Sequence, residues 1–479
     1  MLKIIRRLDG GGIRGIWTLF AIETLMDYVA DEEMKQSKPA EHSFDPVPFP
    51  KYVSHGPFLS HEDKNDHESW MNSRKFLPCH YFDIVCGSST GAKIFGNPRH
   101  VTSLSVGLID RTKYDHKIIE KIFKDVAKRR ERKLSHDSNN EPLFQTGKDL
   151  CGTFVTSIRH VPLEAGNEKK PTILRSYDNT YRDNAPYSQF EMNRSTPCPG
   201  ARSRADVTDH GIQRILRRRT ASFKLSGEAH KWPVWMVARA ATAADFYFEP
   251  LQTEAQGYRG NVTYTDGGLD QRNNPTMEAV WETKDLYGPS SLGAVVSVGT
   301  ARGQTEARVA VVRKLKSMIA DKTDPESVHR QAEKEIQTNR YFRLNEPGAL
   351  DIELDDWRPR KRCFWKPKED SGSQTLRYMR TKFNNWAKDP IQAGKFRVCA
   401  EELVKRRRAR TMDAAKWEHF ATGIQFHCYA DRCRTTFLDR DELENHVRAR
   451  HPSWQRLPEE AKAQAMRFAS FWRYQDGDR

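Results

Sequence analysis

The segment Asp9–Gly15 has the composition of an anion-binding turn. It reads Asp-Gly-Gly-Gly-Ile-Arg-Gly and directly precedes residues 16–29, whose apolar side chains recur at helical spacing. Consecutive glycines adopt backbone conformations that other residues avoid, and they leave several N–H groups to converge on one negative oxygen. The dipole of the following helix favours an anion at the same place. We therefore expect either an oxyanion hole or a phosphate site.

The same glycines also fit a dinucleotide-binding fingerprint, Gly10-x-Gly12-x-x-Gly15. That interpretation requires an apolar strand before the motif and an acidic residue about 20 positions later, after a second strand. Here the preceding strand contains Arg6 and Arg7, and the chain after position 30 is polar and irregular. The sequence therefore favours the oxyanion hole over a nucleotide site.

An apolar strand at residues 81–86 runs directly into a G-x-S-x-G pattern centred on Ser89. In a nucleophile elbow, the glycines of this pattern, here Gly87 and Gly91, permit a tight turn that lifts the serine hydroxyl onto the N-terminus of a helix. Ser89 is therefore a candidate nucleophile. Gly96 and Pro98 follow closely, and because proline disfavours helix in the residue before it, the helix after the elbow is predicted to be short.

A serine hydroxyl needs a base, and residues 262–268 offer one. This β-rich segment ends in Asp266, which is followed by Gly267 and Gly268. A carboxylate presented at the end of a strand can take the serine proton directly. An ordinary Asp-Gly turn is the alternative interpretation of this segment.

These three segments, in this order, resemble the oxyanion loop, elbow and D-G-G turn of the patatin-like phospholipase family, and the fungal branch in particular. The resemblance covers residues 1–410 and implies a catalytic dyad of Ser89 and Asp266. It implies an α/β fold of three layers with a central, largely parallel sheet. It also implies an oxyanion hole in which Arg14 braces the loop and whose residues are Gly10, Gly11, Gly12, Arg14 and Gly15.

The implied function is that of a serine lipid acyl hydrolase, a carboxylic ester hydrolase that cleaves fatty-acyl esters of phospholipids or glycerolipids without a catalytic cofactor. Two alternatives stay open. The short helix after Ser89 also fits a catalytically weak scaffold or lipid sensor, and the C-terminal residues fit a nucleic-acid-associated regulator.

A second motif lies near the C-terminus and resembles a C2H2 zinc finger. Two thiolates on a hairpin and two imidazoles on a helix form a tetrahedral Zn²⁺ site, and Phe437 and Leu443 supply a small apolar core between them. Metal binding would drive the folding of so small a unit. The expected ligands of this structural zinc are Cys428, Cys433, His446 and His451.

The tip of this finger argues against DNA reading. The positions that would face bases are acidic or neutral and include Asp439, Asp441 and Glu442. Because an acidic tip repels phosphate, we expect a protein partner for the finger in preference to nucleic acid.

The 479 residues carry a net charge of +15, concentrated in basic runs at 128–133, 214–219 and 405–410. Such runs are usually solvated helix faces, but they also fit an anionic membrane surface, and the last fits a nuclear localisation signal. The sequence contains neither an apolar segment of transmembrane length nor a secretory signal peptide. We expect a cytoplasmic protein that acts peripherally at membranes, with a nuclear location as the alternative.

The motifs divide the chain into four parts. A catalytic domain at 1–410 contains a polar insert at about 30–75, and residues 411–423 form a linker. The finger spans 424–452, and an amphipathic helix is expected within 453–479. Residues 369–373 look like a loop in a segment that closes the catalytic domain.

Overall fold

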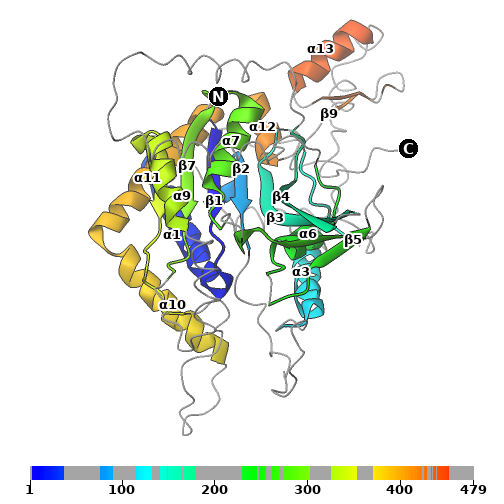
Figure 1. The fold of residues 1–479 in the computed structure, drawn as a ribbon. Helices are drawn as coiled ribbons and strands as arrows, with labels where there is room; N and C mark the ends of the chain where they lie inside the picture. The colour runs from blue at the N-terminus through cyan, green and yellow to red at the C-terminus, as the bar shows by residue number, and fades with distance from the viewer. Residues whose placement is uncertain are drawn as a thin grey trace, which may run out of the picture.

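The protein is described by a computed structural model, whose elements are shown in Figure 1. The residues that it describes are 3–36, 76–89, 114–131, 141–147, 149–163, 166–179, 229–244, 247–254, 261–269, 273–302, 325–352, 371–422, 426–428, 433, 435–437 and 440–451. Several sequence predictions lie outside these residues: Gly91 and the short helix up to Pro98, the basic run at 214–219, and the C-terminal helix at 453–479.

An eight-stranded mixed sheet forms the centre of the described fold, in the order β5-β6-β3-β2-β1-β7-β8, with β4 paired to β3. Its strands are β1 (Lys3–Leu8), β2 (Ile84–Gly87), β3 (Gly152–Leu163), β4 (Gly166–Arg175), β5 (Leu251–Glu254), β6 (Asn261–Asp266), β7 (Leu292–Val298) and β8 (Tyr341–Leu344). Strands β3, β2, β1, β7 and β8 pair in parallel, whereas β4, β5 and β6 pair antiparallel. The expectation of a largely parallel sheet is therefore corrected to a mixed one.

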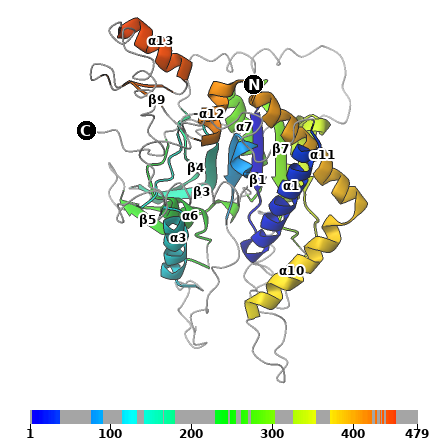
Figure 2. The ribbon, with the colours of Figure 1, turned by 180° about the vertical axis from the view of Figure 1, so that it is seen from behind.

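Helices α1 (Gly15–Lys35), α10 (Ser371–Ala387) and α11 (Pro390–Arg410) cover one face of the parallel half (Figure 2). Their apolar side chains form one cluster with alternate residues of β7, such as Val296. The aromatic contacts are close, because the ring centroids of Trp17 and Phe383 lie 5.0 Å apart. Residues of α10 and α11 thus belong to the same hydrophobic core as α1 and β7.

Helices α7 (Thr276–Tyr287) and α9 (Pro325–Glu335) cover the opposite face. They pack with the other set of β7 residues, including Val295, because successive side chains of a strand point to opposite faces. Helices α6 (Val234–Ala241) and α3 (His116–Glu131) pack together beside the antiparallel strands. The short 3-10 helices are η1 (Gly12–Arg14), η2 (Pro78–His80), η3 (Gly267–Leu269) and η4 (Thr338–Arg340).

Two boundaries differ from the sequence prediction. Helix α1 continues to Lys35, so its last turn occupies the start of the predicted polar insert. Helix α10 begins at Ser371, inside the predicted loop at 369–373. In addition, the expected linker contains helix α12 (Ala414–Thr422), whose Trp417 is buried against the ring of His80.

The basic run at 405–410 pairs with acidic groups of the core. Arg407 Nε and Nη2 donate to Glu33 of α1 at 2.6 and 2.8 Å, and Arg408 Nε donates to the same carboxylate at 2.9 Å. Arg410 Nη2 donates to Asp83 at 2.7 Å. Because Arg407 and Arg410 are buried, the run holds α11 against α1 and does not present a continuous basic surface.

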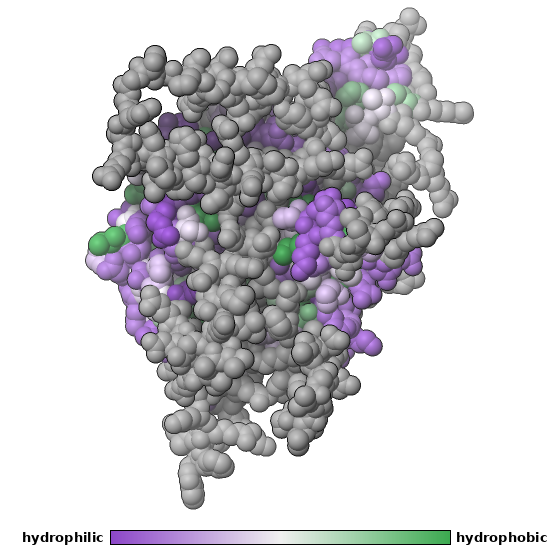
Figure 3. All heavy atoms as spheres, viewed as in Figure 1, coloured by the Kyte–Doolittle hydropathy of each residue, from purple (hydrophilic) through white to green (hydrophobic). Residues whose placement is uncertain are grey.

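No helix among the described residues is long and apolar enough to cross a membrane. The described side chains on the face shown in Figure 3 are mainly hydrophilic, with apolar residues scattered among them. A separate small unit consists of β9 (Phe426–His427), β10 (Thr436–Phe437) and α13 (Arg440–Arg450).

Candidate active site

Strand β3 brings the ends of β2 and β6 together. Strand β2 pairs Gly87 with Val155 of β3 in parallel, and β6 pairs Asp266 with Ser157 in the antiparallel direction. Because β4 occupies the other edge of β3 at these positions, β2 and β6 lie along the same edge and point toward each other. The residues that follow Gly87 and the carboxylate of Asp266 therefore meet at one place.

Ser89 leaves the end of β2 in a strained conformation. Its backbone φ is 53°, in the left-handed region that residues with a side chain rarely adopt. Such a turn is what the G-x-S-x-G pattern predicts. The glycine loop lies directly opposite, because a Cβ placed on Gly10 would come within 3.0 Å of Ser89 Cβ.

The glycine loop joins β1 to α1 through η1, with Gly12 at a φ of 55°. Arg14 is buried, and both its backbone N–H and its Nε contact the carbonyl oxygen of Gly11, at 3.1 and 3.4 Å. On its other side the loop packs closely, since a Cβ on Gly11 would lie 2.7 Å from Thr300 Oγ1. Arg14 thus contacts the glycine loop, and its bracing role stays a prediction.

The N–H group of Gly10 is already used within the fold. It donates to the carbonyl oxygen of Asn273 at 3.0 Å, so it does not point at a substrate in this conformation. Within the described part of the chain, no carbonyl accepts from the N–H groups of Gly11 and Gly12. Of the three glycine N–H groups expected to hold an oxyanion, that of Gly10 is thus occupied in this conformation, and a donor role for Gly11 and Gly12 stays a prediction.

Asp266 is buried, with 2% of its surface exposed. Its Oδ1 accepts from the N–H of Gly268 at 2.7 Å, and its own N–H donates to Ala243 O at 2.9 Å. Gly267 lies against the backbone of β3, because a Cβ there would come within 2.7 Å of the carbonyl carbon of Thr156. The D-G-G turn thus requires glycine to hold the carboxylate at the end of β6.

Asn273 is a site residue that the sequence did not reveal. Its Oδ1 would lie 2.2 Å from a Cβ on Gly10 and 3.4 Å from one on Gly268, so its side chain lies between the glycine loop and the D-G-G turn. The nearby Ser88 hydroxyl would lie 3.3 Å from that same Cβ on Gly268. The only sequence signal for Asn273 is its position shortly after Gly268.

Comparison with curated proteins finds phospholipases that are similar to this chain. The chain is 27% identical to human calcium-independent phospholipase A2-gamma over 294 residues, which cover 58% of this chain and 32% of the human protein. The mouse protein of the same name is 33% identical over 293 residues, with the same coverage. The chain is a distant homologue of calcium-independent phospholipase A2-gamma.

The alignment covers about a third of the length of the human and mouse proteins, 32% in each case. The rat protein is 33% identical over a shorter stretch of 147 residues. No protein-family model matches the chain.

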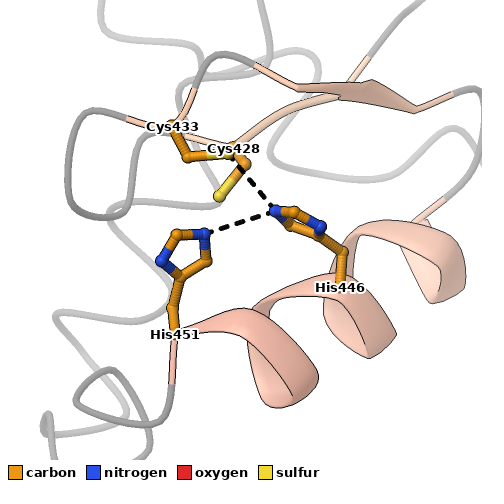
Figure 4. Close-up of side chains that lie close together, drawn as sticks. All are labelled: Cys428, Cys433, His446 and His451. Carbon is orange, nitrogen blue, oxygen red and sulfur yellow. Dashed lines mark hydrogen bonds between the residues drawn. The ribbon is translucent and has the colours of Figure 1, made fainter.

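The four predicted metal ligands converge in the small C-terminal unit (Figure 4). Their ligand atoms all lie within 4.8 Å of one another: those of Cys428, Cys433, His446 and His451. Cys433 Sγ is 3.4 Å from His446 Nε2, which is 3.3 Å from His451 Nε2. Hydrogen bonds from Thr435 and, to a lesser extent, from the two histidines lower the pKa of the Cys433 thiol to about 6. Two sulfurs and two imidazole nitrogens at this spacing form a group that could hold a metal ion, and zinc fits this donor set.

Proposed function

We propose that the chain is a serine lipid acyl hydrolase that cleaves fatty-acyl esters of phospholipids or glycerolipids. One observation carries the proposal. Ser89, with a positive φ, lies against Gly10, and Asp266 is buried on the same edge of β3. The phospholipase A2 name of the homologues supports a lipid ester as the substrate.

In the proposed first step, Asp266 takes the proton of the Ser89 hydroxyl as its oxygen attacks the ester carbonyl. The C=O electrons move onto the oxygen, and the N–H groups of Gly11 and Gly12 stabilise this oxyanion. Donors of this kind contribute about 3 kcal/mol each where they have been deleted in other enzymes. The tetrahedral intermediate collapses, the alcohol leaves with the proton that Asp266 held, and an acyl-serine ester is formed.

In the second step, Asp266 takes a proton from water as the water oxygen attacks the acyl-serine carbonyl. The same two N–H groups hold the second oxyanion. Collapse breaks the ester to Ser89, which regains its proton, and the fatty acid is released. The proposed reaction uses only side chains and backbone of the chain, in keeping with the calcium independence in the name of its homologues.

We also propose the domain organisation that accompanies this activity. Residues 1–410 form the catalytic domain and residues 424–452 a zinc-stabilised finger that contacts a protein partner. The catalytic domain would act at the surface of a membrane, where its lipid substrate resides. The acidic Glu442 on the exposed side of α13 is consistent with a protein partner for the finger rather than nucleic acid.

Two assays with the full chain test the activity: labelling by a serine-directed fluorophosphonate, and hydrolysis of a fluorogenic phospholipid ester. We expect the wild type to react in both, Ser89→Ala to react in neither, and Asp266→Asn to be slower by about 10²–10⁴-fold. Ser291→Ala is the matched control, because Ser291 lies at the opposite end of the sheet and bonds to Thr283 O and Gly288 O.

The proposal fails if the wild type labels no more than Ser89→Ala. Binding of the unreactive wild type to phospholipid vesicles would then favour the scaffold or lipid sensor. Equal labelling of the wild type and Asp266→Asn would overturn the role of Asp266 alone.

A further inference from the structure

We propose that Arg343 is a positioning residue for the oxyanion hole and acts through Asp9, the residue that precedes the three glycines. This inference rests on the proposed hydrolase function. It concerns a residue on β8, a strand that carries none of the motifs from which that function was inferred.

The Arg343 guanidinium joins three elements at the carboxyl ends of the parallel strands. Its Nη2 donates to Asp9 Oδ2 at 2.7 Å and to Glu326 Oε1 of α9 at 2.6 Å. Its Nη1 donates to Ser297 Oγ on β7 at 2.9 Å. The Asp9 side chain is 1% exposed and that of Arg343 7%, so water screens this pair only weakly.

The position of Asp9 determines where the glycine loop starts. Its backbone N–H donates to Val298 O at 3.1 Å, and its side chain is held by Arg343, so both parts of the residue are anchored to the sheet. The N–H groups proposed to hold the oxyanion begin two residues later, at Gly11. A shift of Asp9 would therefore move these donors relative to Ser89.

Glu326 supports the guanidinium from the other side. Asn345 Nδ2 donates to Glu326 Oε1 at 2.9 Å, and Asn345 Oδ1 accepts from Ala301 N at 3.0 Å. Burial raises the pKa of the Glu326 carboxyl, but Arg343, with smaller contributions from His329 and Asn345, lowers it by more, so the pKa is lowered overall. These hydrogen bonds connect the ends of β7 and β8 to α9, and they restrict the orientation of the Arg343 side chain between them.

The test is a comparison of kcat and KM for the wild type, Arg343→Met and Arg343→Lys with a phospholipid ester. A displacement of catalytic donors by about 1 Å can lower the rate by about 10²-fold. We expect Arg343→Met to lower kcat by about that factor with KM within about twofold of the wild type. Arg343→Lys keeps the positive charge but loses the planar guanidinium that donates to several acceptors at once. Its kcat should lie between those of Arg343→Met and the wild type.

The rate of fluorophosphonate labelling per folded molecule separates positioning from stability. We expect Arg343→Met to label more slowly, because the phosphonyl oxygen also occupies the oxyanion hole. Arg175→Met is the matched control, since Arg175 on β4 forms a comparably buried pair with Glu282 on α7, and neither element carries the glycine loop or Ser89. It should lose stability and keep the labelling rate of its folded fraction.

A double-mutant cycle tests the route through Asp9. If Arg343 acts through Asp9, the effects of Asp9→Asn and Arg343→Lys on kcat should be strongly non-additive. Additive effects, or a labelling rate equal to that of the wild type in every folded Arg343 variant, would overturn the inference while leaving the hydrolase proposal intact. If Arg343→Met does not fold, Arg343→Lys and Asp9→Asn decide the question. An unreactive wild type would instead mark the failure of the proposed function.

Discussion

The backbone N–H of Gly10 donates to the carbonyl oxygen of Asn273 at 3.0 Å. This bond joins the glycine loop to the segment that follows the D-G-G turn, so the proposed oxyanion hole and the proposed base are held by one connection. It also means that consecutive glycines do not all serve the same purpose. Gly10 fastens the loop, whereas Gly11 and Gly12 are the proposed donors.

A side chain at Gly10 should abolish most of the activity. The Cβ of Gly10→Ala would lie 2.2 Å from Asn273 Oδ1, which is closer than real Cβ contacts, and 3.0 Å from Ser89 Cβ, which is tighter than most of them. Asn273 must move away, and the loop and Ser89 must separate to relieve the second contact. We therefore expect the fluorophosphonate labelling rate to fall by about 10²-fold.

Gly394→Ala in α11 is the control for this substitution. A Cβ at Gly394 meets no atom within 4 Å, and alanine is favoured over glycine within a helix by about 1 kcal/mol. This variant should label like the wild type and unfold at a slightly higher temperature. A Gly10→Ala variant with the wild-type labelling rate would show that the loop is not in contact with Ser89.

The motifs were predictable from sequence because each depends on local spacing. The positive φ of Ser89, the close packing of Gly267 and the convergence of the Cys and His ligands all follow from short patterns. The meeting of the elbow and the D-G-G turn in space does not follow from such patterns, because it depends on β3 pairing with β2 and β6 along one edge. That pairing is also why the sheet is mixed.

Long-range partners could not be predicted. Arg343 meets Asp9 across 334 positions and Arg407 meets Glu33 across 374, and no local pattern marks either pair. The end of α1 was assigned to a polar insert for the same reason. Glu33 looks like an exposed acidic residue until the guanidinium groups that bury it are known.

Removal of Arg407 should destabilise the protein strongly. The side chains of Arg407 and Glu33 are both fully buried. Arg407→Met therefore leaves the Glu33 carboxylate in the core with Arg408 as its remaining cationic partner among the described residues. Loss of one partner of a buried pair costs about 3–5 kcal/mol, which denaturant unfolding would measure. Lys405→Met, on the exposed side of the same helix, should change the free energy of unfolding by no more than about 0.5 kcal/mol. Equal effects would mean that the basic run is a surface feature.

His230 should make the stability depend on pH in the acid range. Burial and the nearby Arg175 lower its pKa from 6.5 to about 4, and its Nδ1 accepts from the Arg175 N–H at 3.2 Å. The folded state therefore holds a neutral ring where the unfolded state takes up a proton. The contribution is fully present above pH 6.5 and is lost as the pH falls toward 4.

His230→Asn keeps an acceptor near Nδ1 and removes the titrating group. We expect its unfolding temperature to fall less steeply than that of the wild type between pH 6.5 and 4. The two proteins should behave alike above this range, apart from a constant offset. Parallel curves throughout would show that His230 does not titrate differently in the folded and unfolded states.

Zinc removal should unfold the C-terminal unit and leave the proposed catalytic domain folded. The described part of this unit contains two short strands and one helix, and its apolar core includes Leu443, so the metal must supply most of its folding energy. A chelator should accelerate hydrogen exchange in residues 426–451 and leave exchange in α1 and α11 unchanged. Those helices are held by the aromatic cluster and the ion pairs of Glu33.

Cys433→Ser should reduce the bound zinc, about one ion per chain in the wild type, to background in elemental analysis. Cys79→Ser is the matched control, because Cys79 is an exposed cysteine that does not belong to the metal cluster. It should retain the metal. If Cys433→Ser binds as much zinc as Cys79→Ser, the cluster is not the metal site. If it loses zinc but keeps full esterase activity, the metal is structural and the two units work independently, as expected for a reaction that uses only Ser89, Asp266 and backbone amides.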